Sequence, residues 1–110
     1  MELAIIGSRE LTEIEIDKYI PAGVSEIVSG GAKGIDTIAR NFAIRRGIRL
    51  TEFLPNYNVC GRAAPIKRNC EIADYADEAI VMWNGKSKGT KYTISLFEKL
   101  GKKVTVYIVD

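Results

Sequence analysis

Short apolar segments alternate with longer amphipathic segments along the whole chain. Each apolar segment has the length of a strand that is buried on both faces of a sheet. These predicted strands cover residues 3–6, 26–29, 49–54, 78–83 and 104–109. Strands that alternate with helices of about three turns are typical of a parallel sheet with helices on both faces. The sequence therefore predicts an α/β fold with one domain over residues 1–110.

Local signals mark the first two of four predicted helices. Thr12 and Glu15 have the spacing of a capping box, which predicts a helix from about Thr12 to the residue before Pro21. The second helix follows Gly34, and two arginines followed by Gly47 predict its end. Its inward face repeats at three-and-four spacing and contains Ile35, Ile38, Ala39, Phe42 and Ala43.

Two further helices are predicted in the second half of the chain. The first runs from about Pro65 to Tyr75, because proline is favoured in the first helical turn. One of its faces carries Ile66, Cys70 and Ala73. The last helix covers residues 90–100 and ends before Gly101, with Ile94, Phe97 and Leu100 facing inward. Residues 56–62 are expected to form a loop.

Glycines and cations gather in the loops that follow the predicted strands. Open parallel sheets bind ligands beyond the carboxyl ends of their strands. Six of the ten glycines lie in the loops 7–10, 29–36 and 84–90 at that end. The cations in or beside these loops are Arg9, Lys33, Arg62, Lys67, Arg68, Lys86, Lys88 and Lys91, against the acids Glu10 and Asp36. Because glycine turns that open helices present free N–H groups, this end predicts an anionic ligand, most economically a phosphate.

Each of these signals also has a structural interpretation. The loop 29–34 matches neither the Walker A nor the G-x-G-x-x-G pattern, and its glycines would also suit a tight turn with positive φ. The loop 85–90 would suit a flexible lysine-rich connection. Asp36 fits a helix N-terminus as well as a ribose contact. Trp83 belongs either to the core or to a stacking position at the rim.

Composition removes several mechanisms. The chain has no His, which excludes a Ser-His-Asp triad, a Cys-His pair and a His-ligated zinc site, and no metal site is expected. Cys60 and Cys70 form no Cys-x-x-Cys motif and are interpreted as structural or incidental. The net charge is only +2, and no apolar run approaches the ~18 residues of a membrane span. We therefore expect a soluble, cytoplasmic protein without a membrane partner.

Three segments together resemble the Smf/DprA–LOG (SLOG) superfamily. They are residues 28–39 (VSGGAKGIDTIA), 67–81 (KRNCEIADYADEAIV) and 87–93 (SKGTKYT). Gly7-Ser8-Arg9 after the first strand and Trp83 at the end of the fourth resemble the small YspA-like branch of that superfamily. The resemblance spans nearly the whole chain. It implies a Rossmann-like three-layer α/β/α fold, with five parallel strands in the order 3-2-1-4-5.

The resemblance also implies a site for a nucleotide or a nucleotide derivative, such as an ADP-ribose or NAD-type ligand. By position, three glycines (Gly30, Gly31 and Gly34) would hold phosphate, Arg68 and Asn69 would line the pocket, and Ser87, Gly89 and Thr90 would form a second phosphate cradle. All the candidate ligand-binding residues are Gly7, Ser8, Arg9, Ser29, Gly30, Gly31, Lys33, Gly34, Asp36, Arg68, Asn69, Trp83, Ser87, Gly89 and Thr90. A homo-oligomer is expected. The YspA-like branch is described chiefly as binding or sensing nucleotides, without an established reaction.

One departure from the superfamily bears on catalysis. The LOG enzymes hydrolyse the N-glycosidic bond of nucleoside monophosphates and carry a glutamate where this chain has Thr93. Because such a cleavage needs a carboxylate beside the sugar, the sequence favours binding or sensing over catalysis and assigns no catalytic residue. One alternative is a LOG-like hydrolase, in which Asp36 would supply the carboxylate that Thr93 lacks. The other is a DprA-like single-stranded DNA binder that uses the cations and Trp83.

Overall fold

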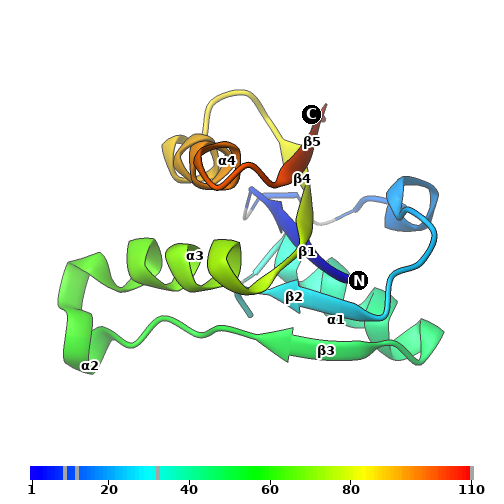
Figure 1. The fold of residues 1–110 in the computed structure, drawn as a ribbon, viewed down its shortest axis with the longest axis horizontal. Coiled ribbons are helices and arrows are strands. Elements are labelled where there is room, and N and C mark those ends of the chain that lie inside the picture. The colour runs from blue at the N-terminus through cyan, green and yellow to red at the C-terminus, as the bar shows by residue number, and fades with distance from the viewer. Residues whose placement is uncertain (9, 12, 32, 110) are drawn as a thin grey trace.

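The computed structural model describes residues 1–8, 10–11, 13–31 and 33–109. Its five strands are all parallel and lie in the order β3-β2-β1-β4-β5, which confirms the predicted fold class and strand order (Figure 1). The strands are β1 (Glu2–Gly7), β2 (Glu26–Ser29), β3 (Arg49–Glu52), β4 (Glu78–Trp83) and β5 (Lys103–Ile108). Strand β1 is central, with β2 at one edge and β4 at the other.

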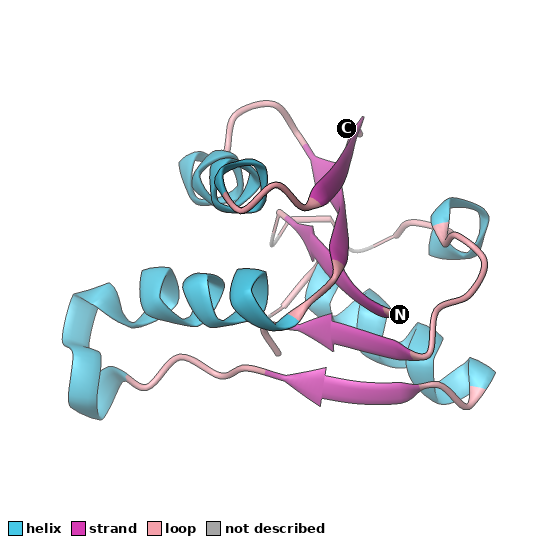
Figure 2. Ribbon diagram, in the orientation of Figure 1, coloured by secondary structure: helices cyan, strands magenta, loops and turns pink. Residues whose placement is uncertain are grey.

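Helices cover the two faces of the sheet and make three layers (Figure 2). On one face lie the 3₁₀ helix η1 (Ile16–Tyr19) and α1 (Ile35–Arg46), and on the other lie α3 (Ala64–Tyr75) and α4 (Lys88–Lys99). The alternation of side chains along β1 explains this arrangement. Leu3 and Ile5 pack in the cluster with α1, whereas Ala4 packs in the cluster with α3 and α4.

The predicted helix before Pro21 is wrong. Thr12 lies outside the described residues, and the segment that follows it forms only the single turn η1, where the Glu15 side chain makes no capping hydrogen bond. Ile14 and Ile16 explain the difference. They are two residues apart, yet both pack against the same core cluster. An extended backbone allows this, whereas residues two apart on a helix do not share a face.

Three smaller predictions also need correction. Residues 56–62 are not a plain loop, because they include α2 (Tyr57–Cys60), capped where Asn56 Oδ1 accepts from the Val59 N–H at 3.3 Å, and the start of the 3₁₀ turn η2 (Gly61–Ala63). Ile66 is exposed, since the buried stripe of α3 is Ala64, Arg68, Ile72 and Ala73. Leu100 is exposed as well, because α4 ends one residue before it.

The end of α3 is closed by a distant lysine. The Lys102 ammonium donates hydrogen bonds to the carbonyl oxygens of Ala73, Asp74 and Ala76, at 2.7, 2.9 and 2.8 Å. The last carbonyls of a helix have no partner within the helix, and a cation there also complements the helix dipole. Lys102 therefore stabilises the carboxyl end of α3.

A buried carboxylate sits between β2, β3 and α3. Glu26 Oε2 accepts hydrogen bonds from the Tyr75 hydroxyl at 2.6 Å and from Thr51 Oγ1 at 2.7 Å, and Arg49 Nε lies 3.6 Å from Oε1. Burial by itself raises the pKa of Glu26. The hydrogen bonds and the arginine charge outweigh burial, so the pKa of Glu26 lies below its usual value of 4.5.

Because the pKa of Glu26 is lowered, the stability of the protein should depend on pH. The folded protein binds fewer protons at Glu26 than the unfolded chain, so the stabilisation is present above about pH 4.5 and is lost as pH falls through the folded-state pKa. Urea unfolding between about pH 6 and pH 3 should show this loss, and Glu26→Gln should make the curve flatter. The exposed Glu13→Gln is the control. Equal pH slopes for Glu26→Gln and the wild type would contradict the assignment.

None of the helices in the described part of the chain combines the length and the apolar character that a membrane crossing requires.

Candidate functional site

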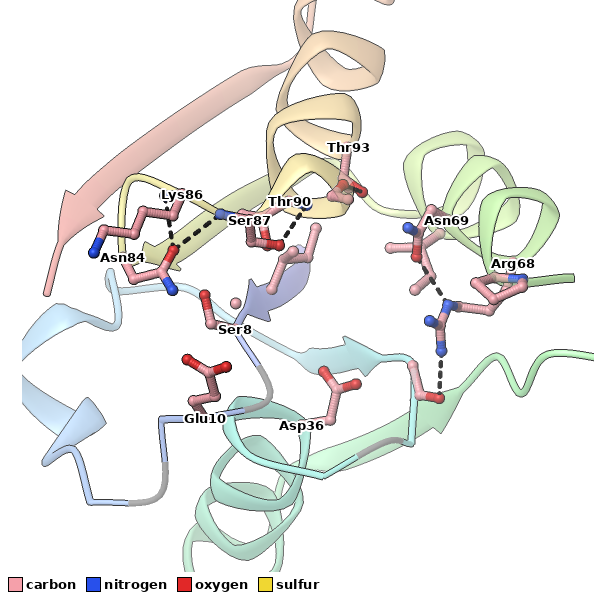
Figure 3. A pocket seen from close by; sticks show the side chains of 16 residues that line it. Ser8, Glu10, Asp36, Arg68, Asn69, Asn84, Lys86, Ser87, Thr90 and Thr93 are labelled. Carbon is pink, nitrogen blue, oxygen red and sulfur yellow. Dashed lines mark hydrogen bonds between the residues drawn. The ribbon is translucent and has the colours of Figure 1, made fainter. Parts of the chain in front are cut away.

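A cleft of about 540 Å³ lies at the carboxyl ends of β1, β2 and β4 (Figure 3). The chain leaves β1 toward β2 on one side, while β4 pairs with β1 on the other side. The cleft is thus at the point where the strand order reverses, which is where open parallel sheets bind ligands. Its volume lies within the range of about 300–1,000 Å³ for small-molecule sites.

The structure brings most of the candidate residues into this cleft. The candidates that line it are Gly7, Ser8, Gly30, Asp36, Arg68, Asn69, Ser87, Gly89 and Thr90. Those that do not line it are Ser29, Gly31, Lys33, Gly34 and Trp83, and Arg9 lies outside the described residues. The sequence did not single out four polar residues of the lining, Glu10, Asn84, Lys86 and Thr93, as ligand contacts.

Gly7, the last residue of β1, and Ser8, which follows it, both line the cleft. A Cβ on Gly7 would lie 2.5 Å from the Met82 carbonyl oxygen and 2.9 Å from Ile35 Cγ2, so only glycine lets β1 end between β4 and α1. Ser8 follows and donates its N–H to the Met82 carbonyl at 3.3 Å. Gly7 thus fixes the position of Ser8.

The Ser8 side chain has an unusual environment. Ser8 is only 5% exposed, and its Oγ is a fully buried polar atom with no hydrogen-bond partner among the described residues. In Figure 3 it lies between Asn84 and Glu10 and borders the open cleft. An unpaired buried hydroxyl destabilises a protein by about 1–3 kcal/mol. The described residues supply no partner for this hydroxyl, so Ser8 is a candidate for a polar contact at the cleft.

The loop between β4 and α4 forms the wall on one side of Ser8. Asn84 Oδ1 accepts from the N–H groups of Lys86 and Ser87, at 2.9 and 3.0 Å. Ser87 Oγ accepts from the Thr90 N–H at 3.3 Å and caps α4. From outside the cleft lining, Trp83 Nε1 donates to the Ser87 carbonyl at 3.1 Å. These bonds fix the positive end of the α4 dipole at the cleft.

Gly30, Asp36 and Arg68 form another part of the lining. Arg68 is 8% exposed, and it donates from Nη1 to the Gly30 carbonyl and from Nε to Asn69 Oδ1, both at 2.8 Å. A Cβ on Gly30 would collide with the Arg68 guanidinium and lie 3.1 Å from Asp36 Oδ2. A side chain at this position would therefore displace the Arg68 guanidinium from its place in the cleft wall.

The other two glycines of the loop 29–34 do not line the cleft. The Gly31 N–H donates to Ser29 Oγ at 3.2 Å, and a Cβ on Gly31 would collide with Leu54. Gly34 precedes α1 with a φ of 72°. The loop therefore contributes Gly30 to the cleft and the first turn of α1 contributes Asp36, whereas the amide of Gly31 already has a partner.

The cleft is mixed in charge rather than uniformly basic. Its lining contains two carboxylates, Glu10 and Asp36, and two cations, Arg68 and Lys86. The other described loop cations are exposed and lie outside the lining: Lys33, Arg62, Lys67, Lys88 and Lys91. In Figure 3, Lys86 and Ser87 are on one side of Ser8, and the two carboxylates are on the other. The end at Lys86 and Ser87 thus suits anions, whereas the end at Asp36 and Arg68 holds both charges and suits hydroxyls.

Two of the four residues that sequence reasoning missed have a recognisable signal. Asn84 stands at the start of an Asn-Gly turn, where its side chain is expected to bond to the following N–H groups. Glu10 is one of the two acids in the strand-end loops. Lys86 was counted only as one of the loop cations, and Thr93 only as the position where the LOG enzymes carry a glutamate.

Comparison of the chain with protein-family models, with curated protein sequences and with solved structures gave no match.

Proposed function

We propose that the cleft binds a small phosphate-bearing molecule, a nucleotide or nucleotide derivative such as an ADP-ribose or NAD-type ligand, and that the protein acts by binding or sensing it. The Ser8 hydroxyl at the strand-order reversal carries this proposal, because it is buried and has no partner among the described residues. The resemblance of residues 28–39 and 87–93 to the SLOG superfamily supports the same class of ligand.

The phosphate end of the ligand belongs beside α4. The Ser8 hydroxyl donates to a phosphate oxygen there, and the α4 dipole and the Lys86 ammonium supply positive charge. The opposite end of the cleft suits the sugar, because the carboxylate of Asp36 accepts hydrogen bonds from ribose hydroxyls. A molecule with a phosphate at one end and hydroxyls at the other matches both ends of the cleft.

Replacement of Ser8 gives a test with opposite effects on stability and binding. Ser8→Ala removes an unpaired buried hydroxyl, so the ligand-free variant should be about as stable as the wild type or up to about 1 kcal/mol more stable. It should also lose most of the rise in melting temperature that AMP, ADP-ribose or NAD gives the wild type. Thermal-shift titrations measure both quantities.

The matched control for this experiment is Ser95→Ala. Ser95 is an exposed serine of α4 outside the cleft, and its Oγ donates to the Tyr92 carbonyl at 2.6 Å. This variant should keep the full response to ligand. Two results would reject the proposal: a wild type that no phosphate-bearing compound stabilises, or a Ser8→Ala variant that responds like the wild type.

One observation favours hydrolysis of a nucleotide N-glycosidic bond as a second candidate function. Thr93 supplies no carboxylate and donates from Oγ1 to the Gly89 carbonyl at 3.0 Å, but Asp36 and Glu10 bring carboxylates to the same cleft. Glycosidic cleavage uses such a group beside the sugar. Release of free base from a nucleoside monophosphate, abolished in Asp36→Asn while ligand binding persists, would establish this activity. Absence of base release would exclude it.

Single-stranded nucleic acid is not proposed as the ligand. No aromatic side chain is among the described residues that line the cleft, and Trp83 is half-buried with its indole N–H bonded to Ser87. A stacking platform, which single-strand binding uses, is therefore not formed at this site.

A further inference from the structure

Strand β5 leaves one edge of the sheet open. In the described part of the chain it pairs only with β4. The Val109 N–H donates to the Trp83 carbonyl at 2.8 Å. Backbone groups of a parallel strand point to alternate sides, so those of residues 105 and 107 face β4 as well. The N–H and C=O groups of Val104, Val106 and Ile108 therefore point away from the sheet and present the unpaired row of an edge strand.

The two edges of the sheet differ in a way that matters for association. Edge strand β3 has four residues and contains Arg49 and Glu52. Edge strand β5 has six residues, and from Val104 to its end it has no charged residue. Val106 is 38% exposed and Ile108 is 64% exposed. Natural edge strands that avoid pairing are short or charged, as β3 is, whereas β5 is longer and carries a charge only at its first residue, Lys103.

Helix α4 presents a matching flank beside this edge. Its buried stripe of Thr90, Thr93 and Phe97 faces the sheet. In a right-handed crossover from β4 to β5, the three-and-four spacing of the helix puts Lys91, Ile94 and Glu98 on the flank toward β5. The opposite flank faces α3, consistent with Leu96 packing in the cluster that contains Ile72.

We propose that β5 pairs antiparallel with β5 of a second copy of this chain, which makes a two-fold symmetric dimer with a continuous ten-stranded sheet. A two-fold axis perpendicular to the sheet makes the pairing antiparallel and keeps both α4 helices on the same face. The charged, four-residue β3 strands then form both outer edges. The dimer is closed, so further copies have no equivalent edge to join.

The dimensions of this arrangement agree with known packing distances. Helix α4 packs on both β4 and β5, so the two α4 helices are about two strand spacings apart. Two spacings of ~4.8 Å give about 9.6 Å. This is within the interaxial distance of about 8–10 Å for packed helices. The dimer therefore buries Ile94, Val106 and Ile108 without moving either chain.

The charges on the α4 flank are also self-complementary. The two helices run antiparallel across the axis, so a register with the axis between Ile94 and Ser95 brings Lys91 of one copy opposite Glu98 of the second copy, and the reverse pair forms by symmetry. Each pair is worth at most about 1 kcal/mol, but opposite charges fix the register and favour this partner. A second copy therefore gives hydrogen bonds to the β5 backbone, buries the apolar side chains beside it and pairs the charges of α4.

Sedimentation equilibrium over a concentration series tests the proposal. The wild type should approach twice the chain mass of 12.2 kDa. Val106→Pro should be monomeric with an unchanged circular dichroism spectrum, because proline removes an N–H that makes no bond within the chain and is tolerated on edge strands. Val106→Thr, which keeps this N–H and the branched shape, is the matched control and should remain dimeric.

Charge exchange gives a second test that does not depend on how proline is tolerated. Lys91→Glu and Glu98→Lys alone should each weaken association about tenfold, since each change acts twice in a symmetric dimer. The double exchange should restore the dimer. A monomeric wild type at every concentration would overturn the proposal. A dimer that neither Val106→Pro nor the charge variants weaken would overturn it as well.

Discussion

Replacing Gly7 with alanine should lower the free energy of unfolding by about 1–3 kcal/mol or more. The new Cβ would stand 2.5 Å from the Met82 carbonyl oxygen, which belongs to the backbone of β4 and has no freedom to rotate away. It would also lie 2.9 Å from Ile35 Cγ2 in the buried start of α1. Strand β1 must then shift against two neighbours. Urea unfolding monitored by circular dichroism measures this loss, and each 1 kcal/mol should lower the melting temperature by about 4–8 °C.

Gly89→Ala is the matched control for this prediction. Gly89 lies in the first turn of α4, its φ is not positive, and a Cβ there would meet nothing within 4 Å. Alanine has less conformational freedom in the unfolded chain, so this variant should gain about 0.4–1 kcal/mol. Equal stability of Gly7→Ala and the wild type would show that β1 does not pass as closely to β4 and α1 as described.

Replacing Arg68 with alanine should affect both stability and ligand binding. Loss of the guanidinium leaves the Gly30 carbonyl without its buried donor, at a cost of about 1–3 kcal/mol. It also frees the Asn69 side chain and removes a cation from the cleft wall. We expect a lower melting temperature and, at temperatures where the variant is folded, a loss of the ligand-induced rise in that temperature.

Lys67→Ala separates this effect from a general loss of charge. Lys67 is the preceding residue of α3, but it is exposed and lies outside the lining. An exposed substitution of this kind should change stability by no more than about 0.5 kcal/mol. Arg68→Lys should not restore the wild-type properties, because an ammonium lacks the fork that reaches Gly30 and Asn69 together. If Arg68→Ala and Lys67→Ala unfold at the same temperature, the bond to Gly30 contributes nothing.

The sequence was sufficient for the fold where one signal dominated. The apolar residues of β1 and β4 predicted buried strands, and Gly47 after two arginines predicted the end of α1, where it has a φ of 64°. The prediction failed where the apolar residues followed neither the strand period of two nor the helix period of 3.6 over a long enough segment. Ile14 lies outside any helix or strand and Ile16 begins the single turn η1, so the helix expected around them is absent from the described residues.

The sequence predicted where in the fold the candidate site lies, but not which side chains contact one another there. The strand-end loops followed from the order of the elements, whereas the direction of each side chain depends on distant neighbours. Arg68 is the clearest example. Apolar periodicity predicted that Ile66 faces inward, because a buried arginine gives no apolar signal. In the structure Arg68 is buried instead, and it bonds to the Gly30 carbonyl. At Gly31 the distant neighbour is Leu54, whose side chain a Cβ on Gly31 would meet.

The lysine at the end of α3 has a consequence for how a newly made chain folds. The carbonyls of Ala73 and Ala76 receive their donor from Lys102, which is synthesised 29 and 26 residues later. Strand β1 likewise waits for β4, since Leu3 pairs with Glu78. Contacts between such distant segments form late, because the connecting loop must close first. The nascent chain therefore cannot pair β1 with β4 until β4 has left the ribosome, and it cannot close the end of α3 until Lys102 has done so.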